Sequence, residues 1–298
     1  MIDVAVVGSL HLDIMVAAPR LPGLDETLIG SSWGTKCGGK GGNQAVAAAR
    51  FGARVQLGGR TGADDFGEQL RRNLVEAGVD VTYVGIDDAH GSGMSVAITE
   101  THGEYGAVVV SGANLTIDAG AVEREWEALW DCKVLLLQNE IPEAVSLAAA
   151  RAAKRRGAMI VLNAAPARRS ASAFLELVDV LVVNRVEAAM LGGSDDAGVA
   201  LKALHRPARD VVLTRGGDGL TIMGRDGGVF ALPALPVKMI SSHGAGDCFC
   251  GALAARLAAG DNLGEACAYA RTAAGLFVSL DETGKRGLSD EMVRQRMI

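Results

Sequence analysis

The length, composition and charge of the chain exclude several classes of protein. It has 298 residues, 49% hydrophobic and 21% charged, enough to bury about three quarters of the unfolded surface in one or two domains. The formal net charge is -6 and Lys and Arg form no block, which argues against nucleic acid or a membrane surface as the main partner.

The N-terminal residues and the cysteines indicate a reducing compartment. The first three residues lack the basic and then apolar layout of a signal peptide, and the longest apolar runs are too short to span a membrane. We therefore expect a cytoplasmic protein. The cysteines show no disulfide framework and are expected to pack as small hydrophobic residues, with a metal or redox role left open only for the Cys-X-Cys pair; they are Cys37, Cys132, Cys248, Cys250 and Cys267.

Short apolar, β-branched segments alternate with helical ones along the chain. Strands are predicted at 4–8, 53–57, 134–137, 159–162, 178–183 and 211–214. Helices are predicted at 43–51, 66–77, 117–130, 142–156 and 195–204. This alternation predicts an α/β fold with a mostly parallel central sheet and helices on both of its faces.

Two segments interrupt the alternation. Residues 11–40 and 92–114 contain glycines and short alternating runs without a helical pattern, so each is predicted to form a small β lid inserted in a single domain, 1–298. Because such a lid exposes sheet edges, we also expect a two-fold homodimer that pairs the lids.

The first glycine-rich stretch is "CGGKGGNQAVAAAR", 37–50. Glycine at this density costs conformational entropy and is typical of backbone that must approach something closely, which suggests a ligand. A flexible loop with Asn43 as a helix N-cap is the alternative. That alternative does not explain Lys40, which stands between paired glycines.

The second stretch is "SSHGAGDCFCGALAARLAAG", 241–260. If a helix begins at Asp247 and runs to Ala259, the amides of Ala245, Gly246 and Asp247 face outward and attract anions. Asp247 is then either a simple N-cap or a general base beside a phosphoryl group.

Other nucleotide and hydrolase motifs fail. The chain has no P-loop, Rossmann or protein-kinase motif. Residues 30–34, "GSSWG", fit G-x-S-x-G, but further glycines follow where a nucleophile elbow needs a helix. A hydrolase acting through Ser32 is therefore disfavoured.

The motifs together resemble the ribokinase-like (PfkB) carbohydrate kinases, with the ribokinases the most similar branch. In chain order they are "GSLHLD", "GGKGGNQA", "QNE", "LNAAPAR", "VNRVEA", "LTRGGDG" and "GAGD", and they span nearly the whole sequence. Most lie just beyond a predicted strand, where open α/β sheets bind ligands. The resemblance implies a ribokinase-like three-layer fold and transfer of the γ-phosphate of ATP to a primary hydroxyl of ribose or a related sugar.

The resemblance also implies roles for individual residues. Asp247 would be the general base that accepts the proton of the sugar hydroxyl, and the amides of Gly244, Ala245 and Gly246 would form the anion hole. The residues implied at the acceptor sugar are His11, Asp13, Gly39, Lys40, Asn43 and Glu140.

For the nucleotide, Asn184 and Glu187 form an N-x-x-E element that would organise Mg²⁺ and phosphate through water. The adenine is implied near Arg271. The implied ATP-binding loop consists of Thr214, Gly216, Gly217, Asp218 and Gly219, with Gly246 beside the phosphates.

Two departures from the family pattern leave questions open. His11 replaces the usual asparagine, so the acceptor can be ribose, deoxyribose, another sugar derivative or a nucleoside, and His11 can also be a buried structural residue. Ser241 replaces an aspartate and His243 occupies a neighbouring position of the monovalent-cation loop, which predicts weak or absent activation by K⁺. A non-catalytic sugar sensor is the alternative of a different class.

Overall fold

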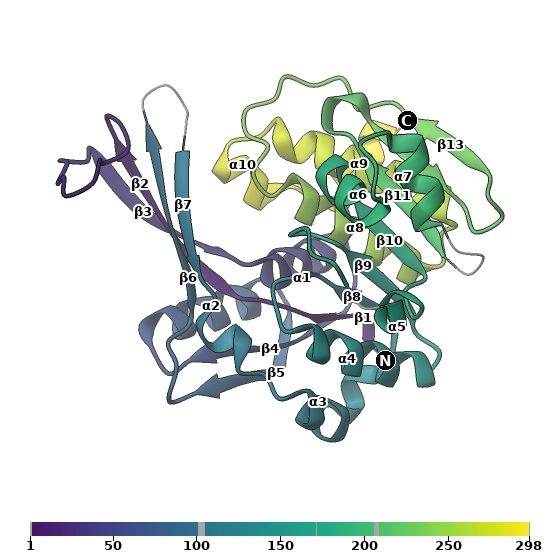
Figure 1. The fold of residues 1–298 in the computed structure, drawn as a ribbon, viewed down its shortest axis with the longest axis horizontal. Coiled ribbons are helices and arrows are strands. Elements are labelled where there is room, and N and C mark those ends of the chain that lie inside the picture. Colours follow the sequence, from purple (N-terminus) through teal and green to yellow (C-terminus); the bar gives the residue numbers. More distant parts are fainter. Residues whose placement is uncertain (1, 101–104, 171, 206–208, 298) are drawn as a thin grey trace.

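The protein is described here by a computed structural model that places residues 2–100, 105–170, 172–205 and 209–297. Figure 1 shows a large sheet covered by helices and a smaller sheet that extends from one side of it. None of the helices in the described ranges is long and apolar enough to cross a bilayer.

The large sheet has nine strands in the order β13-β12-β11-β10-β9-β8-β1-β4-β5. Neighbouring strands from β11 to β5 are parallel, whereas β12 pairs antiparallel with both β11 and β13. The strands are β1 (Ile2–Val7), β4 (Val55–Gly62), β5 (Asp80–Asp87), β8 (Cys132–Leu137), β9 (Met159–Asn163), β10 (Val180–Val183), β11 (Asp210–Thr214), β12 (Leu220–Met223) and β13 (Val229–Leu232).

Alternating side chains of this sheet form two separate hydrophobic cores. In β1, Val4 and Val6 belong to one core, and Ala5 and Val7 belong to the other, as expected for strands buried on both faces. The first core lies under α1 (Lys40–Arg50), α2 (Asp65–Glu76), α8 (Ala245–Ala259), α9 (Leu263–Val278) and α11 (Asp290–Met297). The second lies under α3 (Ala119–Glu125), α4 (Glu143–Arg155), α5 (Ser172–Leu175), α6 (Arg185–Gly192) and α7 (Ala197–Leu204).

The predicted α/β class and parallel sheet are confirmed, but one predicted helix is wrong. Residues 117–130 form α3 and a separate 3-10 helix, Glu127–Trp130, because the chain leaves helical geometry at Trp126. The Trp126 ring packs against Tyr83 and Trp130, with ring centroids 6.1 and 6.3 Å away. Tertiary packing of the aromatic ring therefore overrides the helical pattern.

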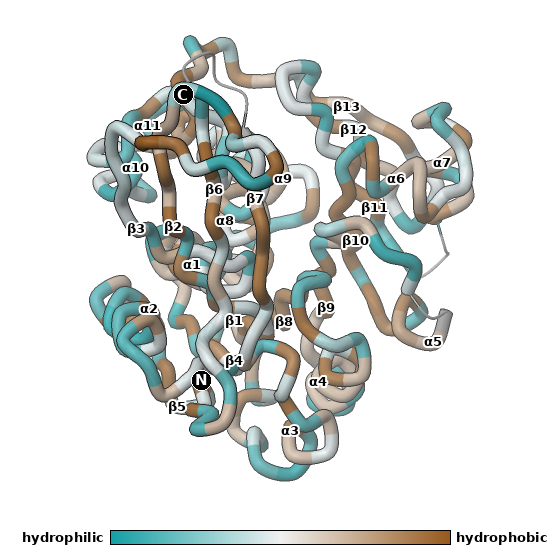
Figure 2. The backbone as a smooth tube through the Cα atoms, turned by 60° about the vertical axis from the view of Figure 1, so that its left-hand side comes forward, coloured by the Kyte–Doolittle hydropathy of each residue, from teal (hydrophilic) through white to brown (hydrophobic). Residues whose placement is uncertain are grey.

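The small sheet has the order β3-β2-β6-β7. Its strands, β2 (His11–Ala18), β3 (Ser32–Gly38), β6 (Gly93–Glu100) and β7 (Tyr105–Val110), come from the two segments predicted to form β excursions. Figure 2 shows hydrophobic colour along β2, β6 and β7. Ser32 is the first residue of β3, and the next helix, α1, begins only at Lys40, so Ser32 does not stand at the strand-to-helix turn that a nucleophile elbow needs.

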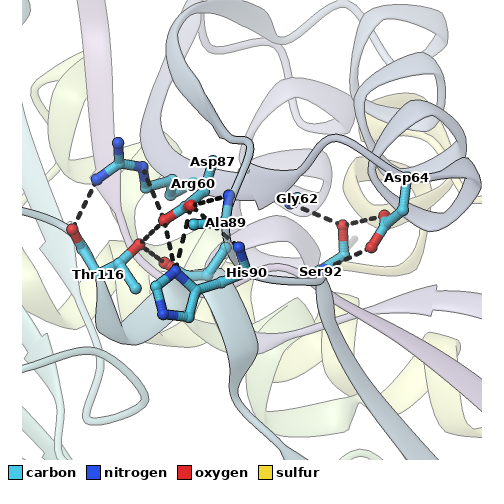
Figure 3. Close-up of polar contacts among 9 residues, drawn as sticks. Arg60, Gly62, Asp64, Asp87, Ala89, His90, Ser92 and Thr116 are labelled. Atoms are coloured by element: carbon cyan, nitrogen blue, oxygen red, sulfur yellow. Dashed lines mark hydrogen bonds and ion pairs between the residues drawn. The ribbon is translucent and has the colours of Figure 1, made fainter.

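Two carboxylates fix the entry to β6 and the exit from β7. Asp64, just beyond β4, accepts hydrogen bonds from the amide and hydroxyl of Ser92 at 2.7 and 2.6 Å (Figure 3). Asp87, the last residue of β5, accepts from the Thr116 hydroxyl at 2.5 Å and from the Ala89 amide at 2.9 Å. The small sheet is thereby anchored to the carboxyl ends of two strands of the large sheet.

A buried asparagine anchors the start of β2 as well. The Asn114 side chain accepts from the Leu10 amide at 2.9 Å and donates to the Leu10 carbonyl at 2.8 Å. Because Asn114 is fully buried, breaking these bonds would leave polar groups without partners, which is costly.

Candidate active site

The motif residues gather at the carboxyl ends of the parallel strands. The chain runs from β1 outward through β4 to β5, and then from β8 outward in the opposite direction. Adjacent β1 and β8 therefore form a switch point, where open α/β sheets leave a crevice for ligands. The segments that follow β1, β8, β9, β10 and β11 all carry motif residues.

Asp247 lies at this crevice as the third residue of α8. The helix begins at Ala245, with Gly244 as N-cap at a φ of 81°, so the prediction that Asp247 starts or caps the helix is wrong. Its carboxylate accepts hydrogen bonds from Asn43 Nδ2 at 3.0 Å and from Gln44 Nε2 at 2.9 Å. The side chain is thus held from α1 rather than by its own helix.

The surroundings of Asp247 suit a base. Burial raises the pKa of its carboxyl, whereas the nearby Lys40 ammonium and the bonds from Gln44 and Asn43 act to lower it. Asp247 is only 8% exposed. Burial also acts to lower the pKa of Lys40, but the charges of Asp247 and Glu140 outweigh this effect and raise it. Lys40 therefore stays charged beside the carboxylate.

The amides before Asp247 are unequal. Ala245 N donates to the Ser242 carbonyl at 3.1 Å, so the expectation that this amide is open to an anion needs correction. The amides of Gly246 and Asp247 have no hydrogen-bond partner among the described residues. These two donors form the open end of the helix.

The glycines around Lys40 lie against the protein's own backbone. A Cβ at Gly39, whose φ is 81°, would lie 2.7 Å from His11 N, and one at Gly41 would lie 2.5 Å from Gly8 C. These glycines therefore let α1 pack against the chain that follows β1. The alternative of a flexible loop capped by Asn43 is wrong, because α1 begins at Lys40.

Glu140 lies in a hydrogen-bonded cluster beside α1. Its Oε2 accepts from Ser9 Oγ at 2.5 Å and from the Lys40 amide at 2.8 Å. His11 Nδ1 is 3.9 Å from the same oxygen. His11 is 4% exposed, and burial lowers the pKa of its imidazole. Asp13 lies in the small sheet, where it accepts from Ser95 Oγ at 2.5 Å.

Two cavities meet at Asp247. Gly244 and Asp247 line both of them, so the Asp247 carboxylate and the start of α8 lie between the two cavities. The larger one, of about 630 Å³ and hereafter the chamber, includes the predicted acceptor residues Asp13 and Asn43. The smaller one has a volume of about 240 Å³ and is lined by Lys40, Asn163, Ala165, Pro166, Val182, Val183, Asn184, Glu187, Thr214, Gly244, Gly246, Asp247, Phe249 and Cys250.

Asn184 and Glu187 form a capping box at the start of α6. Asn184 Oδ1 accepts from the Glu187 amide at 2.9 Å, and Glu187 Oε2 accepts from the Asn184 amide at 2.7 Å. Burial raises the pKa of Glu187. No group of three or more His, Cys, Asp or Glu side chains within the described ranges could hold a metal directly. A carboxylate with free lone pairs in a polar cavity nevertheless fits Mg²⁺, which keeps several of its waters.

Of the remaining predicted residues, Thr214 lines the smaller cavity and His243 lines the chamber. Gly216, Gly217, Asp218 and Gly219 form the turn after β11, where Gly216 and Gly219 have φ of 57° and 84°. Asp218 forms an ion pair with Arg185. Ser241 Oγ accepts a hydrogen bond from the amide of His243 at 3.4 Å. Arg271 donates to the Pro233 carbonyl at 3.0 Å.

Residues that sequence reasoning missed position the predicted ones. Gln44 bonds Asp247 and in turn accepts from Gln138 Nε2 at 2.9 Å. Ser9 bonds Glu140, and Ser95 bonds Asp13. The only signal in the sequence is that Ser9, Gln44 and Gln138 stand inside or beside the motifs.

Comparison with known proteins identifies the family. The sequence model described as "pfkB family carbohydrate kinase" matches residues 1–288. Ribokinase of Bacillus subtilis is 34% identical over 276 residues, covering 93% of this chain and 92% of its own. Ribokinase of Mus musculus is 35% identical over 270 residues, with 87% and 83% covered. Deoxyribokinase of Salmonella typhi is 31% identical over 259 residues, with 85% and 84% covered.

The fold agrees with solved structures. The structure of Arabidopsis thaliana ribokinase with ribose and ATP has a TM-score of 0.91 and 25% identity, covering 99% of this chain and 98% of its own. Ribokinase of Thermotoga maritima has a TM-score of 0.88 and 25% identity, with 100% and 99% covered. The chain therefore belongs to the pfkB family of carbohydrate kinases, phosphotransferases with an alcohol acceptor and a ribokinase-like fold.

Proposed function

We propose that the protein transfers the γ-phosphate of ATP to the primary hydroxyl of ribose or a related sugar. The observation that carries this proposal is the position of Asp247, a buried carboxylate that lines two cavities at once. The acceptor would enter the chamber, between Asp13 and Asn43, and the triphosphate would occupy the smaller cavity beside Thr214 and Glu187. The printed names of the relatives, ribokinase and deoxyribokinase, support a pentose acceptor.

Phosphoryl transfer depends mainly on positioning of the two reactants and on neutralisation of the phosphate charge. Asp247 takes the proton of the acceptor hydroxyl as its oxygen attacks the γ-phosphorus. Amides of Gly246 and Asp247 and the ammonium of Lys40 face the charge of the phosphoryl group. Glu187 and Asn184 would hold Mg²⁺ through water. When bound with ATP, this ion supplies charge neutralisation at the phosphate oxygens.

The acceptor needs a direct test. Deoxyribose, another sugar derivative or a nucleoside would undergo the same chemistry. These acceptors stay as alternatives because His11, beside Glu140, differs from the usual asparagine of the family. A panel of acceptors with ADP release as the readout separates them. A non-catalytic sugar sensor is disfavoured, since Asp247, Asn184, Glu187 and the open amides of α8 are all in place; sugar binding without ADP release would favour it.

The assignment of the base is tested by Asp247→Asn. The amide keeps the shape and some of the hydrogen bonds of the side chain but cannot accept the proton, so we expect kcat to fall by about 10²- to 10⁴-fold. The dissociation constant of the sugar, measured by calorimetry, should change little. A variant with near-normal kcat would contradict the assignment.

The proposal includes the surroundings of the reaction. The small sheet would act as a lid over the chamber, in one ribokinase-like domain spanning 1–298. The protein would act in a reducing cytoplasm, where its five cysteines stay free thiols. Two copies would associate through their small sheets.

A further inference from the structure

The chamber continues well beyond the residues expected to hold a pentose. One face of α1 lines it with Asn43, Val46, Ala47 and Arg50. At 1.5 Å rise per residue, Arg50 stands about 10 Å beyond Asn43 along the helix. Helices α2 and α10 (Glu282–Gly287) form the walls of this far part, and β3 contributes its last residues. The far part is therefore made by fixed helices as well as by the small sheet.

Basic groups exceed acidic ones there. Beyond Asp13 and Asp247 at the acceptor end, the acids that line the chamber are Glu76 and Glu282. Glu282 is neutralised by Lys36 at 2.8 Å and by Lys285 at 2.9 Å. Three guanidinium groups remain, those of Arg50, Arg72 and Arg286, and none has a carboxylate within ion-pair distance in the part of the chain that the structure describes.

The three arginines come from three different helices but line the same chamber. Cys37 lines the same part of the chamber. Burial raises the pKa of its thiol, and Asp13 and Glu76 add to this effect, whereas Arg72 from α2 and Arg286 from α10 both oppose it. Both guanidinium groups are thus near enough to Cys37 to influence its charge. Arg50 is half-buried, so its charge is partly shielded from solvent.

We propose that Arg50, Arg72 and Arg286 form an anion subsite, and that the acceptor is a sugar carrying a phosphate or carboxylate remote from its reacting hydroxyl. This inference rests on the proposed kinase function and narrows its substrate class. Arginine presents a planar fork of donors that matches both acidic groups, and a cleft lined by one sign of charge concentrates the opposite ion. A neutral pentose would fill only the inner part of the chamber.

The test compares acceptors that share a free primary hydroxyl and differ at the opposite end. Ribose and methyl riboside are neutral, whereas ribose 1-phosphate and ribonate carry an acidic group. We expect kcat/KM for an anionic acceptor to exceed that for methyl riboside by about tenfold or more, because a hydrogen bond to a charged group is stronger than one to a neutral group. Methyl riboside controls for size.

Variants locate the effect. The double substitution Arg72→Gln and Arg286→Gln should reduce the ratio of the two kcat/KM values by about tenfold or more. Arg151→Gln serves as the matched control, since Arg151 is exposed on α4 and lines neither cavity. Calorimetric binding of ribose 1-phosphate to the wild-type protein and to the double variant gives a readout independent of turnover.

Three outcomes would overturn the inference in distinguishable ways. If kcat/KM for neutral acceptors equals or exceeds that for anionic ones, and the double variant leaves the ratio of the two values unchanged, the subsite is contradicted and the kinase function is not. Stimulation of ribose turnover by inorganic phosphate, without preference for an anionic acceptor, shows that the arginines take a separate anion. If no acceptor gives ADP release, the kinase proposal is contradicted. If the wild type and the double variant also bind ribose 1-phosphate equally, the subsite is contradicted as well.

Discussion

At the scale of the residue, the carboxylate of Asp247, the proposed base, depends on neighbours that set its proton affinity. Asp247 is buried and receives one hydrogen bond from Asn43 and one from Gln44. Burial favours the neutral acid, and the two donors favour the carboxylate. A base must be ionised to work, so these donors widen the pH range over which Asp247 can accept a proton.

Replacing one donor should shift this range. Gln44→Met keeps the volume of the buried side chain but removes its hydrogen bond to Asp247, so the pKa of Asp247 should rise further. As the pH is lowered, the variant should therefore lose activity at a higher pH than the wild type. The acid limb of the kcat profile measures the shift. Gln56→Met is the matched control, because Gln56 is also buried but bonds Asp80. An unmoved acid limb in Gln44→Met would mean that Gln44 does not tune the base.

The sequence pointed to the candidate site residues more clearly than to the residues that hold them in position. Asp247, Lys40 and Asn43 stand in glycine-rich stretches whose composition marks them. Gln44 and Gln138 are single polar residues next to a helix start and a strand end, and such residues are ordinarily solvated. Only the packing of α8 against α1 and β8 brings them under Asp247, which no local pattern in the sequence encodes.

At the scale of the element, the start of α1 is fixed by contact between backbones. Gly39, Gly41 and Gly42 lie against the residues that follow β1, and a Cβ at any of them would come within 3.0 Å of a neighbour. The packing places Lys40 and Asn43 at the crevice. The glycine density was correctly predicted to mean close approach, and the protein's own chain following β1 is the neighbour that the structure shows.

Adding one methyl group should therefore disturb the acceptor site. In Gly41→Ala the new Cβ would lie 2.5 Å from Gly8 C, and overpacking of this kind costs about 1–3 kcal/mol. We expect a lower Tm and a higher KM for the sugar. Gly34→Ala, with nothing within 4 Å of the new Cβ, is the control. Equal Tm and KM in both variants would show that α1 can shift without consequence.

The loop around Ser241 belongs to the same scale. The amides of Ile240 and Ser241 donate to the Val278 carbonyl, which brings this loop to the end of α9. Nearby, the Lys285 ammonium is buried, 2.9 Å from Glu282 and 5.0 Å from the centre of the Phe277 ring. The region thus contains an ammonium paired with Glu282, and it lacks the carboxylate at position 241 that would attract a further cation.

Potassium should accordingly have little effect. At equal ionic strength, we expect rates in potassium chloride and tetramethylammonium chloride to differ by less than about twofold, because a hard cation needs negatively charged oxygen ligands. Steady-state ADP release gives the comparison. A rise of about tenfold with K⁺ would show that the altered loop still forms a cation site.

Some elements escaped prediction for physical reasons. Strand β13 is short and largely exposed, so it lacks the apolar run that marked the buried strands. Strand β5 mixes exposed and buried positions at the edge of the sheet. The buried parallel strands between them were predictable because both of their faces are covered.

At the scale of the whole molecule, the small sheet is the least covered part. Its edge strand β7 has no neighbour on one side within the described chain, and the side chains of Val108, Val109 and Val110 are 68%, 58% and 52% exposed. On β3, Trp33 is 75% exposed. An apolar sheet with open edges invites pairing with another sheet, and a second copy of the chain offers the same surface.

We therefore expect a two-fold dimer that Val108→Lys disrupts. Burying a charge between two apolar sheets without a partner is costly, so sedimentation should show the variant as a monomer at concentrations where the wild type is a dimer. Val199→Lys is the control, since Val199 is 54% exposed on α7, outside the small sheet. A wild type that sediments as a monomer, or a Val108→Lys dimer as stable as the wild type, would contradict association through this sheet.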